Sequence, residues 1–145
     1  MAVDTLTLIQ EEILSRLKSK FVQPIYEVAL PDSETLIRDK NGKFVPYIAI
    51  QFGDLQQQGS RNMAHAWGHN YVMPIYCGTV APDASTTRKL ANKLNLILLG
   101  YTNEYTGEIE KRAGGMMYPI PAQMGAFEAM VAPASFGLPV QILEV

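Results

Sequence analysis

The most reactive side chain in the sequence is the thiol of Cys77, the single cysteine among 145 residues. A nucleophilic cysteine needs a nearby histidine, a cationic group or a helix N-terminus that lowers the pKa of its thiol. Cys77 lies instead within residues 70–80, where apolar side chains alternate as they do along a strand. Free cysteines in such places are commonly buried. We therefore expect Cys77 to pack in the core and to have no catalytic role.

Two histidines form the next candidate site. His65 and His69 are four residues apart, a spacing that on a helix places both imidazoles on one face, as in many zinc sites. Trp67 and Gly68 between them favour a strand, in which the two histidines would be about 13 Å apart. No glutamate adjoins His65, and the only other clear soft ligand in the sequence is Cys77. We therefore expect no metal site.

The remaining polar residues do not suggest a catalytic set. Asp54 follows a predicted strand, where a turn residue is expected. Gly114 and Gly115 are not followed by a helical pattern, so they do not predict a phosphate-binding loop. The hydroxyl groups of residues 85–87 are explained by capping of the helix that follows. We expect no enzymatic activity and no cofactor.

The composition is typical of one compact domain. Hydrophobic residues make up 48% of the chain and charged residues 18%, below the roughly 25% of an average globular domain. The net charge of -2 gives no reason to expect a protein that coats nucleic acid. The N-terminus lacks a signal-peptide pattern, and the longest apolar run, residues 96–99, is too short to span a bilayer. We expect a single domain over residues 1–145 and a soluble cytoplasmic protein, unless something else carries it out.

Two helices are predicted by apolar residues that recur every three or four positions. The first covers residues 5–20 and ends before Pro24. The second begins after Asp83 or Ser85, either of which can cap it, and ends before Gly100, which suits a left-handed C-terminal cap. The stripes expected to face a sheet are Leu6, Ile9, Ile13, Leu17 and Phe21 in the first helix and Leu90, Leu94, Ile97 and Leu98 in the second.

Strands are predicted over much of the remaining chain. Asn41-Gly42 predicts a hairpin turn, and Pro74 predicts that its strand is a sheet edge or carries a bulge. The predicted fold class is α/β of the α+β kind, with one mixed, largely antiparallel sheet, two covering helices and long hairpin loops. The strand ranges are 25–30, 47–52, 70–80, 116–120, 127–131 and 138–145.

Two polar segments, residues 56–64 and 103–115, are predicted to be long loops or hairpins. Ordering such a segment costs roughly 1–2 kcal/mol per residue in backbone entropy. Loops longer than about 12 residues are usually functional or disordered. We expect contacts with other subunits or partner proteins, with solvated loops as the alternative. The candidate interface residues are Gln56, Gln57, Gln58, Arg61, Asn62, Glu104, Glu108, Glu110, Lys111 and Arg112.

The order of the elements carries a resemblance to a known family. A helix, antiparallel strands and a long hairpin precede the segment YVMPIYCGTVAPDASTTRKLANKLNLILLGY. A Gly-containing loop and closing strands that end in PVQILEV follow it. Over essentially the whole chain this order resembles the tail terminator (tail completion) proteins of long-tailed bacteriophages. The most specific part of the resemblance is the strand, the APDAS sequence, the helix and the LLGY sequence that ends it.

The resemblance implies a structural virion protein with an α/β fold, located in the tail or neck and assembled in the host cytoplasm. It implies a homo-hexameric ring that caps the tail tube, ends tube polymerisation and presents a surface for head–tail joining. The implied partners are the tail tube protein and a neck or head-completion protein. DNA would pass through the lumen of the ring without sequence-specific binding, and no membrane is involved.

Three other functions stay open at this point. A neck or head-closure connector subunit of the same kind of virion has a similar size and similar loops. A small metal- or thiol-dependent enzyme would require His65, His69 and Cys77 to converge, which metal analysis would test. A monomeric ligand-binding module would form no ring, which light scattering after size exclusion would test.

Overall fold

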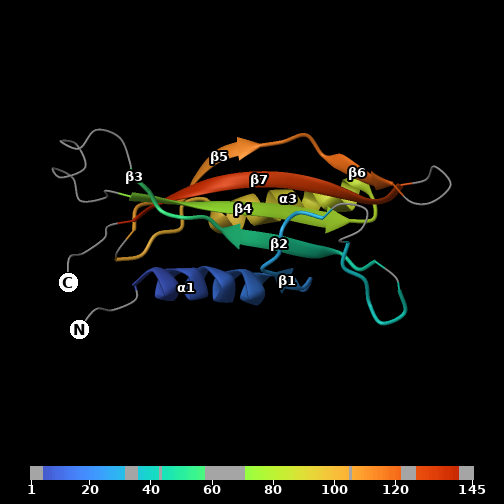
Figure 1. Ribbon diagram of the computed structural model, residues 1–145, viewed down its shortest axis with the longest axis horizontal. Helices are drawn as coiled ribbons and strands as arrows, with labels where there is room; N and C mark the ends of the chain where they lie inside the picture. Colours follow the sequence, from blue (N-terminus) through green and yellow to red (C-terminus); the bar gives the residue numbers. More distant parts are fainter. Residues whose placement is uncertain are drawn as a thin grey trace.

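A mixed sheet with two helices forms the centre of the molecule in a computed structural model (Figure 1). The structure describes residues 5–31, 36–42, 44–57, 71–104, 106–121 and 127–140. Within these residues the elements are α1 (Thr5–Lys20), β1 (Ile25–Tyr26), β2 (Tyr47–Phe52), β3 (Gln56–Gln57), β4 (Tyr71–Ala81), α3 (Ala84–Leu98), β5 (Glu110–Gly114), β6 (Tyr118–Pro121) and β7 (Phe127–Val140).

The strand order along the sheet is β1-β2-β4-β7-β5, with β3 also beside β4 and β6 also beside β7. β1 pairs with β2 in parallel, and the other described pairs are antiparallel. The predicted α+β class, with a mixed and largely antiparallel sheet covered by two helices, is therefore confirmed.

Two long strands, β4 and β7, carry the sheet. They pair from Tyr71 opposite Val140 to Ala81 opposite Met130. Each long strand has two short strands along its outer side, β2 and β3 beside β4, and β5 and β6 beside β7. The sequence predicted β7 as two separate strands, 127–131 and 138–145, and this is wrong because residues 127–140 form one strand. Residues 141–145 lie outside the described part of the chain.

Both helices cover the same face of the sheet. Figure 1 shows α3 behind β4 and β7, and α1 along the side of the sheet that carries β1 and β2. The helices and the sheet enclose one apolar core between them. Phe21 belongs to this core and Leu6 packs against it, so the predicted stripes are confirmed. The side chains that the helices bury in it are Ile9, Ile13, Leu14 and Leu17 from α1 and Leu90, Leu94, Ile97 and Leu98 from α3.

The start of α3 is fixed by hydrogen bonds to the preceding turn and to the sheet. Asp83 caps the helix, because its Oδ1 accepts from the amide of Thr86 at 2.7 Å and its Oδ2 accepts from the Thr86 hydroxyl at 3.0 Å. The Thr87 hydroxyl lies 2.8 Å from the Asp83 carbonyl oxygen and 3.2 Å from the Met130 carbonyl oxygen in β7. At the other end, Gly100 has a φ of +82°, which an L side chain rarely adopts. The predicted cap residues at both ends are confirmed.

The face opposite the helices is covered over part of its area by the chain that follows β1. Figure 1 shows this segment passing in front of β2 and β4, so the strand predicted over residues 25–30 ends at Tyr26. The Leu30 side chain occupies the space that a Cβ on Gly78 would take, so the crossing segment packs directly on the β4 backbone. The Tyr118 hydroxyl then donates to the carbonyl of Pro31 at 3.2 Å. A second apolar cluster fills this region, formed by Leu36, Tyr47, Ala49, Val80, Ile120, Ala129 and Val131.

Pro74 does not mark a sheet edge, because β4 lies between β2 and β7. The edge alternative is therefore wrong. The bulge alternative fits the neighbouring chain, where the three residues 53–55 stand opposite the two residues 73–74. The Pro74 carbonyl accepts from the Gly53 amide at 2.8 Å, in the interval between the end of β2 and the start of β3. In an antiparallel strand the nitrogen and the carbonyl of one residue face the same neighbour. The nitrogen of Pro74 therefore faces the gap between β2 and β3. No hydrogen bond of the sheet is lost there for want of an N–H.

The prolines of β7 follow the same rule. The Pro133 carbonyl accepts from the Gly115 amide at 3.3 Å, between β5 and β6, and the Pro139 carbonyl accepts from the Gly107 amide at 2.9 Å, before β5 begins. Each central proline thus faces an interruption in a short outer strand. The sheet tolerates proline in its two central strands because the strands beside them are short and interrupted.

Candidate interaction surface

On the face away from the helices, the described part of the sheet exposes side chains over its β5 half. A row of paired residues crosses four strands there: Gln51 in β2, Tyr76 in β4, Ser135 in β7 and Ala113 in β5. Tyr76 is 46% exposed, unusual for a tyrosine in the middle strand of a sheet. We call this surface the open face.

A hollow of about 250 Å³ lies on the open face. Small residues surround Leu30 and Tyr76, so the backbones of β5 and β7 are close to the surface. A Cβ on Gly115 would lie 2.9 Å from Pro133 Cγ, which shows how closely the strand end approaches β7. Met116, 91% exposed, follows at the rim. The hollow, here named the β5 hollow, is lined by Leu30, Tyr76, Cys77, Ala113, Gly114, Gly115, Pro133, Ala134 and Ser135.

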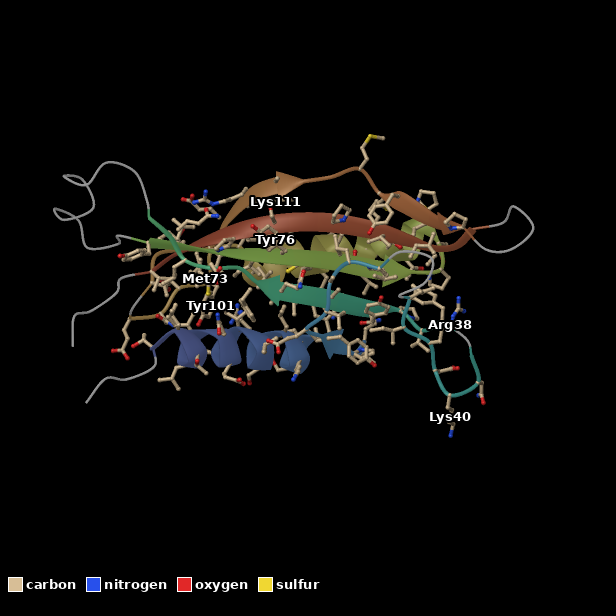
Figure 2. All side chains as sticks on the ribbon, viewed as in Figure 1. Arg38, Lys40, Met73, Tyr76, Tyr101 and Lys111 are labelled. Carbon is tan, nitrogen blue, oxygen red and sulfur yellow. The ribbon has the colours of Figure 1, made fainter. Side chains whose placement is uncertain are left out.

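One basic side chain, that of Arg112, lies beside the β5 hollow on the open face. All five residues of β5 are exposed, and the register shifts between Lys111 and Ala113, so Arg112 is the extra residue of a β-bulge. A Cβ on Gly137 would collide with the Arg112 guanidinium, so the glycine lets this side chain lie across β7. Figure 2 shows Lys111 on β5, with Tyr76 nearby over the central strands. The open face therefore combines an apolar hollow with one basic side chain, Arg112, which we call the basic rim. Lys111 pairs with the core residue Phe136 and so lies on the helix-side face.

The predicted interface residues are distributed over two sheet margins and one connection. Gln56 and Gln57 form β3 and pair with Val72 and Tyr71, so this part of the predicted loop is strand. Glu110, Lys111 and Arg112 lie in β5, which corrects the second predicted loop: residues 110–114 are also strand. Glu104 and Glu108 are exposed in the connection from α3 to β5. Gln58, Arg61 and Asn62 lie outside the described residues.

Hydrogen bonds hold the connection from α3 to β5 against the sheet. The Thr102 hydroxyl donates to the Thr106 carbonyl at 2.8 Å, and the amide of Asn103 donates to the Thr106 hydroxyl at 3.0 Å. The Ile109 amide donates to the Tyr101 carbonyl at 2.9 Å. This segment is polar because its polar groups pair with one another, a local reason that needs no partner protein.

A second hollow, of about 280 Å³, lies between α1 and this connection. Its lining combines Leu8 and Ile9 with Glu12, Asn103 and Glu104. Nearby, the Tyr101 hydroxyl accepts from the Asn103 side-chain amide at 3.3 Å. Burial, together with a hydrogen bond to Glu12, raises the pKa of Tyr101 to about 12, so the phenol stays neutral at physiological pH. Two exposed carboxylates do not make a metal site, and no group of three metal-ligating residues occurs among the described residues.

Of the side chains that first suggested chemistry, the structure describes Cys77. Cys77 is buried in the main core between β2 and β7, as predicted, and its burial raises the pKa of the thiol to about 12. The thiol is therefore protonated and enclosed, the opposite of what a nucleophile requires. His65 and His69 lie outside the described residues.

The β5 hollow has no counterpart in the sequence prediction. Leu30, Tyr76 and Pro133 are far apart along the chain, and only the crossing of the sheet by residues 27–31 brings Leu30 to β4. The one available signal was the exposed side of the strand at residues 70–80, where Tyr76 alternates with buried neighbours.

A comparison with protein-family models gives no match, and a search of curated proteins gives no significant match. None of the helices in the described ranges has the length and apolar character needed to cross a membrane.

Proposed function

We propose that this chain is a ring-forming subunit that caps the tail tube of a long-tailed bacteriophage, ends tube polymerisation and offers the tail-side surface for head–tail joining. The observation that carries the proposal is the open face: an apolar hollow with a basic rim, set on a sheet whose margins are free among the described residues. Exposed apolar surface of this kind marks protein–protein contact sites. The order of elements that resembles tail terminators gives the contact its context.

The geometry also fits a scaffold better than a mobile binding module. The long β4–β7 pair extends through the sheet, and both helices pack on the other face. The open face is thus held by a rigid layer, which favours repeated, identical contacts in an assembly.

The proposal is tested by disrupting the gene in the phage that encodes the chain. Tails are then expected to lose their uniform length and to stay unattached to heads, and the wild-type chain supplied in trans should restore both. Uniform tails joined normally to heads in the absence of the protein would contradict the proposal. Heads without attached tails, but with tails of normal length, would identify the neck-connector alternative instead.

A further inference from the structure

The two margins of the sheet differ in a way that makes them complementary. β5 lies at one margin and β1 at the other, and neither has a further strand beside it among the described residues. A free strand edge exposes unpaired N–H and C=O groups that can pair with another chain. Figure 2 shows Lys111 at the β5 margin, Tyr76 over the central strands, and Arg38 and Lys40 at a turn on the opposite side of the sheet.

The β1 margin carries exposed apolar side chains and an acid. Val22 is 95% exposed, and Tyr26 and Val45 are also exposed and line one small hollow together. Glu27, at the end of β1, is exposed. We name Val22, Tyr26, Glu27 and Val45 the β1 patch. It offers apolar side chains for the β5 hollow and the Glu27 carboxylate for Arg112.

We infer that copies of this chain join head to tail, with the β1 patch of one copy seated against β5 and the β5 hollow of the next. The inference names the contact between subunits of the proposed ring, and it rests on the proposed function for the number of copies. Each copy uses each margin once, so the contact is heterologous and generates a closed ring or an open filament.

The strand directions fix how the two margins would pair. β1 runs parallel to β2, and each step from β2 through β4 and β7 to β5 reverses direction. β1 and β5 therefore point in opposite directions within one copy. If neighbouring copies are related by rotation about an axis along the strands, β1 of one copy meets β5 of the next in antiparallel fashion. The sheets then continue from copy to copy by strand addition.

The inference is tested with cysteine pairs, because Cys77 is buried and does not compete for oxidation. The test variant carries Ala113→Cys on β5 and Tyr26→Cys at the β1 margin. Mild oxidation should give a ladder of covalent oligomers in the double variant. A mixture of the two single variants should give one heterodimer and nothing larger. The matched control pairs Ala113→Cys with Leu96→Cys, since Leu96 is 82% exposed on α3, and should give no ladder.

Charge exchange provides a second readout at the same contact. Arg112→Glu should reduce cross-linking in the double-cysteine background, and adding Glu27→Arg should restore it. Circular dichroism would confirm that each variant is folded. No ladder in the double variant, or an equal ladder in the Leu96 control, would overturn the inference. Capped tails without the ladder would show that copies do not join through the β1 and β5 margins, and would leave the proposed function intact. A ladder without tail capping would support the contact between these margins and overturn the proposed function.

Discussion

At the scale of single residues, Cys77 shows how position decides chemistry. The same thiol at a helix N-terminus would be a candidate nucleophile, but between β2 and β7 it is a small apolar side chain. We expect Cys77→Ala to leave assembly intact with a modest loss of packing. In the native protein the thiol should resist a water-soluble thiol reagent and should react after unfolding. Rapid labelling of the folded protein, or loss of assembly with the fold preserved, would contradict this account.

The raised pKa of Cys77 also predicts how stability depends on pH. The thiol pKa rises from 9.0 to about 12 on folding, because burial disfavours the thiolate. Between these values the unfolded chain has released the proton and the folded chain still holds it, so this group makes stability fall as pH rises. Cys77→Ala should therefore lose less stability than the wild type from pH 9 upward. The free energy of unfolding would be measured by denaturant titration at several alkaline pH values. If Cys77 is not buried, it should fall by the same amount with pH in the wild type and in Cys77→Ala.

Leu94 tests the helix placement at the same scale. Leu94 is 1% exposed in the core between α3 and the sheet, so Leu94→Ala should cost about 2–5 kcal/mol of unfolding free energy. Leu96, two residues on, is 82% exposed, and Leu96→Ala should change stability by no more than about 0.5 kcal/mol. Equal midpoints for the two variants in denaturant unfolding would show that α3 is rotated.

At the scale of elements, the Asp83 cap gives a prediction about α3. Asp83→Ala removes both hydrogen bonds to Thr86 and should lower the melting temperature, whereas Asp83→Asn keeps an acceptor and should lower it less. Hydrogen bonds from Thr86 depress the pKa of Asp83. The stabilisation is therefore present above the ordinary pKa of 3.8 and is lost as pH falls through the lower folded value. A pH profile below 4 that is unchanged in Asp83→Asn would contradict this.

The helices could be predicted because their signals are local. The stripe ending at Leu98, the cap at Asp83 and the turn at Gly100 all act within a few residues, and the structure places them as expected. The strand at 47–52 was equally clear. The helices satisfy their backbone groups internally, and the strand at 47–52 has an apolar pattern that can be recognised from its own residues.

The sheet centre and its margin could not be predicted in the same way. Pro133 and Pro139 interrupt the alternation of β7, and their tolerance depends on gaps in strands that are distant in sequence. β5 lacks alternation because all its residues are exposed, so it reads as a loop. The β5 hollow exists only once Leu30 has crossed to β4. Each of these features is a property of pairing across the sheet and leaves no local pattern.

At the scale of the whole molecule, the two faces of the sheet differ, and the proposed function assigns contact with other subunits to the open face. The two helices close the face that holds the main core, while the open face has an apolar hollow with Arg112 beside it. Among the described residues, neither sheet margin has a further strand beside it. Burying such a surface favours association by roughly 25 cal/mol per Å² of apolar area, less the cost of ordering the partners. We therefore expect the proposed subunit to act as one of several identical copies in an assembly.

The most direct measurement of the central claim is electron microscopy of tail tubes assembled with and without the purified protein. The proposed function predicts a ring of copies at one end of each tube and tubes of uniform length, with longer, uncapped tubes when the protein is omitted. Tube ends without a ring, and the same length distribution in both preparations, would contradict it.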